Sequence, residues 1–451
     1  MRRISLLPAV MCAALAAFDP PDVNAQDRPT AFTGAKIIPI EGAEIDNGTL
    51  VIEKGKIVAV GPAAEVKILD GAEKVDVAGK VIMPGLICTH SHIGGLRTGS
   101  GGADGSAPIQ PGVRIMDAID VHDSGFKRAV AGGLTTLNIM PGSGHLISGQ
   151  TIYVKLRLEG PKPRRIDDFF ILDAQGKSLG GLKMANGTNS MRESPFPGTR
   201  GKSAFLVREQ YIKAREYADK IARAAGDPAK MPPRDLNLEA LVEAMQGKRI
   251  VHHHTHRHDD IMTVLRLAQE FGFSVVLHHV SDGWKVAEEI AAAKAPCSVI
   301  VIDAPGGKQE ALDARFETGG ILEKAGVPVA FHTDDYITDS RVFRRSAALA
   351  VRAGMSRAGA LHALTLAGAQ MLGLADRVGS LKAGKDADFA ILEGDPLSVY
   401  CKTKETWVEG RKVFDRNDPK DRLYAVGGYG AGSALVPYLC CYDEAVAGGE
   451  Q

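Results

Sequence analysis

The sequence has no excess of either charge, since 54 lysines and arginines balance 54 aspartates and glutamates. A chain without a basic excess has no global field that would attract nucleic acid or an anionic membrane surface. Low-complexity tracts and repeats at solenoid periods are also missing. We therefore expect no nucleic-acid partner. A hydrophobic content of 45% and 51 glycines are typical of a globular α/β enzyme rich in tight turns.

Long apolar runs are absent as well. A membrane span needs about 20 consecutive apolar residues, whereas the apolar stretch from Leu6 to Phe18 is shorter and contains Pro8. This stretch follows two arginines and precedes small residues at positions 23–25, which is the pattern of a cleaved secretory signal peptide. We expect no membrane span, removal of residues 1–25 as a signal peptide, and a periplasmic or secreted mature protein.

Cysteine is scarce, with six residues in 451. Cys12 lies in the expected signal peptide, and the other cysteines are irregularly spaced and odd in number, which does not indicate a disulfide framework. Export permits disulfides without requiring them. We interpret Cys88 as a small core residue. For the adjacent Cys440 and Cys441, packing is a better interpretation than cross-linking.

With 451 residues, the chain is long enough for a (β/α)8 barrel and a second, smaller domain. Short β-like segments occupy residues 35–77, and similar segments return only after residue 379. Between them, helical and strand patterns alternate as a parallel barrel requires. We predict an α/β fold: a (β/α)8 TIM barrel at residues 85–375, and a small β-sandwich built from both chain ends, residues 26–84 and residues 376–451 with the tail.

The apolar run from Val81 to His92 is the centre of this interpretation. It is typical of one buried strand, and it ends in two histidines separated by a single residue. Side chains two positions apart on a strand face the same side, so His90 and His92 can present both imidazoles to one divalent ion. Taken alone, two ordinary loop histidines would be the simpler interpretation of this pair.

Two sets of motifs resemble the amidohydrolase superfamily, closest to its imidazolonepropionase-like and prolidase-like branch. The first is Pro84-Gly85-Leu86 ahead of the histidine pair, and the second is the segment 379–388 followed by residues 408–411. The resemblance covers most of residues 31–415. It implies a TIM barrel that binds one or two divalent ions, Zn²⁺ above all, at its C-terminal face. It also implies a hydrolase that acts on a small molecule.

The resemblance further implies a series of site residues at the ends of successive strands. The metal ligands that it indicates are His90, His92, Lys183, His254, His279 and Asp334. Asp334 follows an eighth strand expected at residues 327–335 and would also be the catalytic proton shuttle. His332 shares the face of Asp334 by alternation, so it could line the pocket.

Lys183 decides between one ion and two. A lysine in an apolar strand is costly unless it is paired or modified, and prolidase-like relatives carry here a lysine carboxylated by CO2 that bridges two metals. The alternative is a lysine at the strand edge with its amine in solvent. Relatives with Gly-Glu-Asn nearby can offer a carboxylate, whereas this chain has Thr188 in the middle of that triplet. Without a modified Lys183, we expect a single ion.

Five histidines stand among the seven residues 252–258. A metal-scavenging tract on the surface is one interpretation, but the run follows an apolar start and precedes two aspartates that open a helix. Alternation places His252, His254 and His256 on one face. The family pattern selects His254 as the ligand and gives His256 the catalytic role of polarising the substrate, with His256 as the competing ligand.

Residues 187–246 form a long excursion between strands. Helices are expected at residues 203–225 and after Asn237 as the cap, and a further helix is expected earlier, at residues 117–132. We interpret the insertion as a lid at the barrel mouth. Arg192 and Arg200 could together hold a substrate carboxylate, although a solvated surface role is the simpler interpretation of each arginine alone.

We predict a metal-dependent hydrolase that cleaves the C–N bond of a small amide or cyclic amide, such as an N-acyl, dipeptide-like or imidazolone-related compound. A heterocycle deaminase is one alternative, although the extra glutamate that it needs is not evident beside His254. A lactonase, esterase or phosphotriesterase on the same scaffold is another. A non-catalytic scaffold without metal is the third, and the series of ligand residues argues against it. A homo-oligomer is compatible with the sequence.

Overall fold

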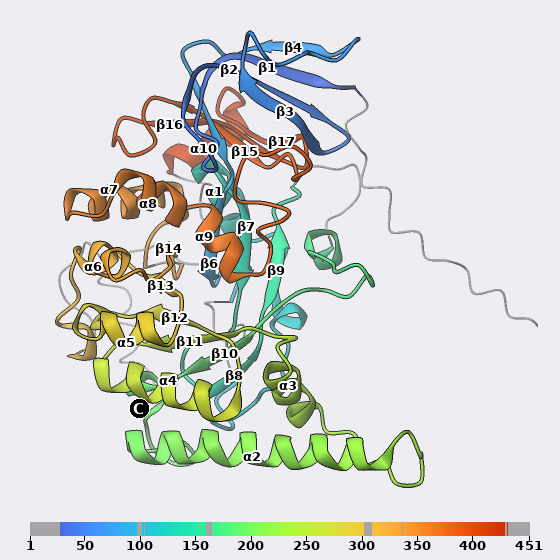
Figure 1. Ribbon diagram of the computed structural model, residues 1–451, viewed down its shortest axis with the longest axis vertical. Helices are drawn as coiled ribbons and strands as arrows, with labels where there is room; N and C mark the ends of the chain where they lie inside the picture. Colours follow the sequence, from blue (N-terminus) through green and yellow to red (C-terminus); the bar gives the residue numbers. More distant parts are fainter. Residues whose placement is uncertain are drawn as a thin grey trace, which may run out of the picture.

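The computed structural model describes residues 28–96, 102, 104–158, 165–301, 309–335, 337–428 and 431. The expected signal peptide lies outside the described residues, as do Cys12, Cys440 and Cys441. The protein is a mixed α/β molecule with a small sheet at one end and a layer of helices along one side of the remaining strands (Figure 1). None of the helices that the structure describes combines the length and apolarity of a membrane span.

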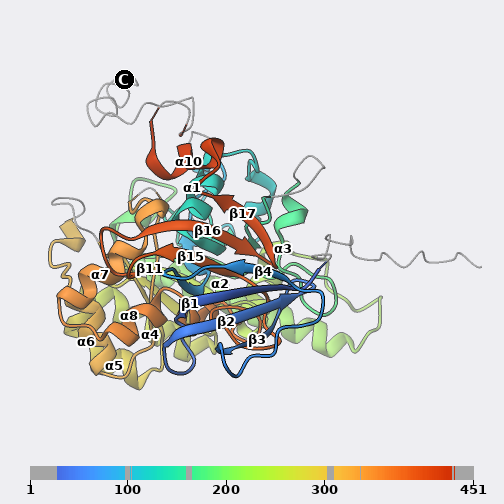
Figure 2. The ribbon, with the colours of Figure 1, turned by 90° about the horizontal axis from the view of Figure 1, so that it is seen from above.

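The small sheet contains strands from both ends of the described chain. Its strands run in the order β17-β16-β15-β5-β1-β2-β3, with β4 paired to β1. Their bounds are β1 Thr30–Ile37, β2 Ile45–Glu53, β3 Lys56–Pro62, β4 Glu73–Asp76, β5 Val81–Pro84, β15 Phe389–Glu393, β16 Lys402–Val408 and β17 Arg411–Asp415. Strand β5 pairs antiparallel with β15, so the two groups share one sheet, seen from above in Figure 2.

The chain leaves the small sheet at Gly85. The run expected as one strand is two strands, because β5 ends at Pro84 and β6 (Leu86–Ser91) belongs to a different sheet. A Cβ at position 85 would lie 2.2 Å from Oγ1 of Thr135, so only glycine fits where the two sheets meet. The expectation of one continuous strand is wrong, since apolar character does not show which sheet each half pairs with.

The remaining strands form two sheets with the orders β6-β7-β9 and β14-β13-β12-β11-β10-β8. Their bounds are β7 Leu134–Ile139, β8 Ile147–Gln150, β9 Ile152–Lys155, β10 Leu182–Ala185, β11 Val251–Thr255, β12 Val275–His279, β13 Cys297–Val299 and β14 Val329–Phe331. Strands β10 to β14 are parallel, as are β6 and β7. After β14, the backbone N–H of Asp334 donates to the carbonyl of His90 at 3.1 Å, which links the last strand to the first.

Helices and short 3-10 turns connect these strands. The helices are α1 Ser124–Gly132, α2 Arg200–Ala224, α3 Leu236–Met245, α4 His258–Phe271, α5 Ala287–Ala292, α6 Thr318–Lys324, α7 Arg344–Arg352, α8 Arg357–Ala363, α9 Leu366–Met371 and α10 Pro419–Val426. The 3-10 turns are η1 Ile115–Ala118, η2 Ile166–Phe169, η3 Gly187–Ser190, η4 Gly283–Lys285, η5 Gln309–Ala311 and η6 Ser340–Val342.

Three of these elements differ from the sequence predictions. Helix α1 begins seven residues later than residue 117, because Asp123 caps it by accepting from the N–H of Gly125. The cap of α3 is Asp235 rather than Asn237. The seventh barrel strand, expected at residues 299–303, is β13 and ends at residue 299; residues 302 and 303 lie outside the described part of the chain.

Helix α2 packs on α3 and α4, and its first turns line a cavity that Ala185 of β10 and His253 of β11 also line. Its Tyr211 is fully buried, stacks on Phe271 and Phe273 with ring centroids 5.0 Å apart, and donates to Sδ of Met184 in β10 at 3.4 Å. Its apolar stripe therefore faces the protein interior.

Candidate metal centre

Two histidines at the end of β6 face the same point. Nε2 of His90 lies 3.1 Å from Nε2 of His92, as alternation along a strand predicts. Nδ1 of His92 lies 2.8 Å from the carbonyl oxygen of Met140. A carbonyl oxygen only accepts hydrogen bonds, so Nδ1 carries a proton and Nε2 is the ring nitrogen that faces His90.

Asp334, just after β14, joins this pair. Its Oδ1 lies 3.1 Å from Nε2 of His92 and 3.5 Å from Nε2 of His90. Its φ of 45° falls in the left-handed region, which is uncommon outside glycine and concentrates at functional sites. The structure therefore brings Asp334 together with both histidines of β6.

The backbone around Asp334 is held by its neighbour. Asp335 is buried and accepts hydrogen bonds from three hydroxyl groups, those of Ser91, Thr333 and Ser340. These bonds tie the loop after β14 to β6 and to the start of η6. They fix the backbone next to Asp334 and do not involve the Asp334 carboxylate.

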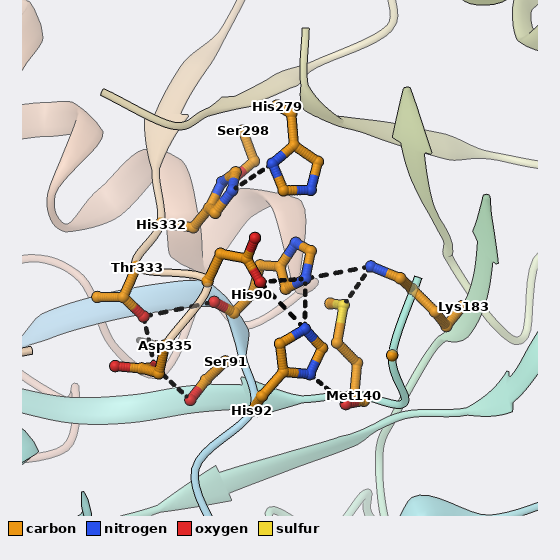
Figure 3. A network of polar contacts seen from close by, with 12 residues as sticks. His90, Ser91, His92, Met140, Lys183, His279, Ser298, His332, Thr333 and Asp335 are labelled. Carbon is orange, nitrogen blue, oxygen red and sulfur yellow. Dashed lines mark hydrogen bonds and ion pairs between the residues drawn. The ribbon is translucent and has the colours of Figure 1, made fainter. Parts of the chain in front are cut away.

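Lys183 reaches the same point from β10. It is fully buried, and its Nζ lies 3.2 Å from Nε2 of His90 and 3.1 Å from Sδ of Met140. Figure 3 shows that His92 and Lys183 both point toward His90. The alternative of a lysine at the strand edge with its amine in solvent is therefore wrong, because β10 turns this side chain into the interior.

A second group of ligands lies at the ends of β11 and β12. His254, His256 and His279 each offer a ring nitrogen, and these nitrogens lie within 4.8 Å of one another. Ring centroids are 4.2 Å apart for His254 and His279, and His256 stacks on His279 at 4.9 Å. Nδ1 of His256 lies 2.8 Å from the hydroxyl of Ser281. Since His254 and His256 belong to the same group, both stay candidates for the ligand position.

His332 was not among the ligands indicated by the sequence. It is fully buried, and it forms a third group with His90 and His279 whose ring nitrogens lie within 4.8 Å. The groups overlap, because His90 belongs to two of them and His279 to two. Because side chains alternate along a strand, the sequence placed His332 on the same pocket-facing side as Asp334. It did not indicate which histidines His332 would contact.

Another pair of buried histidines lies beside these groups. Nε2 of His252 is 2.9 Å from the hydroxyl of Tyr153, and its Nδ1 is 3.0 Å from Nε2 of His278. The ring of His278 lies edge-on to His90 at 5.0 Å. Sequence reasoning gave no role to His278 or Tyr153, and no local signal could have paired Tyr153 with a histidine 99 positions away.

Burial sets the protonation of the centre. Burial, followed by the charge of Lys183, holds the pKa of His90 well below 6.5, and burial does the same for the pKa of His279. Burial by itself would raise the pKa of Asp334, but the contact with His92 and nearby positive charge outweigh it and lower that pKa. At neutral pH the imidazoles of His90 and His279 are neutral and the carboxylate of Asp334 is ionised, the forms in which these side chains bind metals.

A sequence model of the amidohydrolase family matches residues 223–414. The solved structure of an amidohydrolase from Thermotoga maritima MSB8 is 31% identical, has a TM-score of 0.78, and matches over 86% of this chain and 100% of its own. The chain belongs to the amidohydrolase superfamily. The fold of such neighbours is a TIM barrel with an additional domain. This protein is therefore an amidohydrolase, an enzyme that acts on carbon–nitrogen bonds.

Two curated relatives of this amidohydrolase agree with that assignment. Amidohydrolase tasK of Hapsidospora irregularis is 27% identical over 82% of this chain, which spans only 40% of that protein. An imidazolonepropionase of Rhizobium rhizogenes is 25% identical over 80% of this chain and 90% of its own length. The resemblance to the imidazolonepropionase-like branch that the sequence motifs indicated is therefore confirmed.

The residues of this amidohydrolase fit a divalent ion, on which its family depends. Oδ1 of Asp334 lies 3.1 Å from Nε2 of His92, so a carboxylate oxygen and an imidazole nitrogen offer two ligand atoms side by side. Zinc–nitrogen bonds in a tetrahedral site place two ligand nitrogens about 3.3 Å apart. The nitrogen–nitrogen distance is 3.1 Å between His90 and His92 and 3.3 Å between His279 and His332.

Arg192 and Arg200, the two arginines that could together hold a substrate carboxylate, both contact groups of the protein. Nε of Arg200 lies 2.8 Å from Oδ2 of Asp260, and its Nη2 lies 3.4 Å from Oε2 of Glu310, so its guanidinium is engaged by carboxylates of the protein. Arg192 donates to the carbonyl of Gly144 at 3.0 Å.

The region of Thr188 contains a carboxylate from a distant segment. Oε2 of Glu310 accepts the backbone N–H of Thr188 at 2.8 Å, and a Cβ on Gly187 would lie 2.5 Å from the same oxygen. Glycine at position 187 therefore makes room for Glu310. Sequence reasoning missed Glu310, because it lies 122 positions from Thr188.

Proposed function

We propose that this amidohydrolase hydrolyses the C–N bond of a small amide or cyclic amide at a zinc centre held by strand-end histidines. The overlap of three ligand groups carries the proposal, since His90 and His279 each belong to two of them. Both histidines are buried, which argues against a surface tract that binds metal adventitiously. Imidazole nitrogens combined with a carboxylate suit zinc.

The proposed ligands come from five strands. They are His90, His92, Lys183, His254, His279 and Asp334. When bound, the ion lowers the pKa of a water molecule and polarises the scissile carbonyl. The side chains around it are held on rigid strand ends, so little reorganisation accompanies the reaction.

Asp334 is the proton shuttle in this proposal. Its lowered pKa keeps the carboxylate ionised at neutral pH, and its side chain is 21% exposed while His90 behind it is fully buried. It is therefore accessible to a substrate entering from solvent. The carboxylate accepts a proton from the attacking water and delivers it to the leaving nitrogen, which departs as an amine.

His256 has the second catalytic role. The hydroxyl of Ser281 holds its Nδ1 at 2.8 Å and so fixes the orientation of the ring. We assign to His256 the polarisation of the substrate carbonyl through a hydrogen bond. Its membership in the group with His254 and His279 supports a position beside the reacting atoms.

The number of ions depends on Lys183. The ligand groups support two positions, one at His90, His92 and Asp334 and one at His254, His256 and His279. A Lys183 carboxylated by CO2 would supply oxygens to both, whereas an unmodified amine supplies a positive charge and suits a single ion. We propose carboxylation of Lys183 as the route to two ions, supported by its complete burial beside His90.

A substrate panel with metal control tests the proposed function. Purified protein, protein stripped of metal and the Asp334→Asn variant would be assayed with dipeptides, N-acyl amino acids, cyclic imides, lactones and aminated heterocycles. We expect amide or cyclic amide hydrolysis that disappears on stripping and returns with Zn²⁺. Turnover confined to deamination or to ester cleavage would contradict the proposal while leaving the metal centre intact.

Three further expectations belong to this proposal. We propose that β6, β7 and β10 to β14 belong to one closed (β/α)8 barrel, supported by the bond from Asp334 to the carbonyl of His90. We propose that the small sheet folds into a sandwich, supported by the contact of Phe32 with Phe389 and Trp407. Export of the protein rests on the signal-like pattern of residues 1–25 alone.

A further inference from the structure

His332 is held in one orientation by a chain of hydroxyl groups. Its Nδ1 lies 2.7 Å from Oγ of Ser298 in β13, and that hydroxyl lies 2.6 Å from Oγ1 of Thr89 in β6 (Figure 3 shows His332 and Ser298). All three side chains are fully buried. The ring of His332 therefore cannot turn without breaking a bond that no water can replace.

This orientation aims the other ring nitrogen at the ligand groups. Nε2 of His332 lies 3.3 Å from Nδ1 of His279. Its ring stacks on that of His90 with centroids 4.9 Å apart and an angle of 22°. His332 is thus next to both histidines that the ligand groups share.

A buried histidine can make the same kinds of contact without belonging to a ligand group. His252 shows that case, because its two nitrogens lie close to the hydroxyl of Tyr153 and to His278, and it belongs to none of the ligand groups among the described residues. His332 differs from His252 in the histidines that it meets, because His279 and His90 each belong to two ligand groups. Metal-binding histidines typically hold their second nitrogen by an outer hydrogen bond like the one at Nδ1 of His332.

We propose that His332 is a further ligand of the metal centre, positioned by Ser298. Its place next to both His90 and His279 joins the group on β6 to the group on β11 and β12. The inference rests on the proposed function only in requiring that the protein binds a divalent ion. It concerns which residues bind that ion, and it does not depend on the substrate.

Cobalt binding tests the assignment without using activity. Co²⁺ would be titrated into full-length protein stripped of metal, with affinity from calorimetry and coordination from the visible absorption spectrum. The variants are His332→Gln, which keeps a polar side chain of similar reach, and Ser298→Ala, which leaves the imidazole but removes its tie. His252→Gln is the matched control, since it changes a buried histidine outside the ligand groups.

The expected results differ for each variant. His332→Gln should weaken Co²⁺ binding by roughly 100-fold or more and change the spectrum, and Ser298→Ala should weaken it by about 10- to 100-fold, as loss of an outer partner does. The Co²⁺ affinity of His252→Gln should stay within about threefold of the wild-type affinity, a much smaller change than the losses expected for the other two variants. Thermal unfolding of the metal-free proteins, compared with and without Co²⁺, verifies that the variants fold.

The failures of the two proposals can be told apart. The ligand assignment would be overturned if Ser298→Ala kept the wild-type Co²⁺ affinity and spectrum and a folded His332→Gln also kept the wild-type affinity. The hydrolase proposal would still stand in that case. If His332→Gln does not fold, an unchanged Ser298→Ala by itself overturns the assignment. Wild-type protein that binds Co²⁺ but hydrolyses none of the panel would overturn the proposed function alone. Wild-type protein that binds no Co²⁺ would overturn both.

Discussion

Replacement of Asp334 by asparagine removes the proton-accepting charge while changing little else. The two side chains have nearly the same shape, and asparagine is among the residues that best tolerate a left-handed backbone such as the φ of 45° at this position. The backbone N–H that donates to the carbonyl of His90 is unaffected. An amide oxygen can still approach Nε2 of His92, so the position of the side chain should persist.

The magnitude follows from the lost proton transfer. A general acid–base group contributes about 10²–10⁴ in rate, which corresponds to about 2.7–5.4 kcal/mol at 1.36 kcal/mol per factor of ten. We expect Asp334→Asn to lose that much in kcat while it retains much of its metal. Because the substrate is still bound by the remaining side chains, KM should change much less than kcat.

Steady-state kinetics together with metal analysis of the same preparation form the assay. Asp339→Asn is the matched control, because Asp339 lies on the same loop, caps η6 and contacts Arg341 instead of the histidines. It should keep wild-type kcat and metal content. A rate loss below tenfold in metal-loaded Asp334→Asn would refute the proton-shuttle role. Loss of all metal from this variant would show that Asp334 acts mainly as a ligand.

Three other predictions concern metal binding and stability. His92→Ala should lose both bound metal and turnover in elemental analysis and kinetics, and undiminished turnover of metal-free wild type would contradict the reasoning. Lys183→Ala should reduce the metal content from about two ions to one or none, with bicarbonate unable to restore it; unchanged stoichiometry would assign Lys183 a structural role. Lys155 is fully buried and contacts Asp386 and Asp388, which lie just before β15 of the small sheet. Lys155→Met should therefore lower the free energy of unfolding by about 3–5 kcal/mol in urea titrations, because the buried carboxylate of Asp388 loses the cation beside it. A loss below about 1 kcal/mol would exclude that role.

Local periodicity accounts for what could be predicted about the site. A strand has a repeat of two, so the sequence already indicates that His90 and His92 share a face, and that His252, His254 and His256 share another. The structure has both. Motifs at the chain ends indicated the superfamily for the same reason, since they are contiguous stretches that need no knowledge of distant contacts.

The sequence alone therefore determined the family and indicated the strand-end histidines and Asp334 as candidate ligands. Only the tertiary structure decided what those residues meet. Lys183 and His90 are 93 positions apart, and His332 and Ser298 are 34 apart. Their contacts depend on the register of several parallel strands, which no local pattern encodes. The engagement of Arg200 by Asp260, the change of sheet at Gly85 and the packing of Tyr211 on Met184 have the same origin: each depends on which surfaces are buried together, and burial is a property of the folded chain.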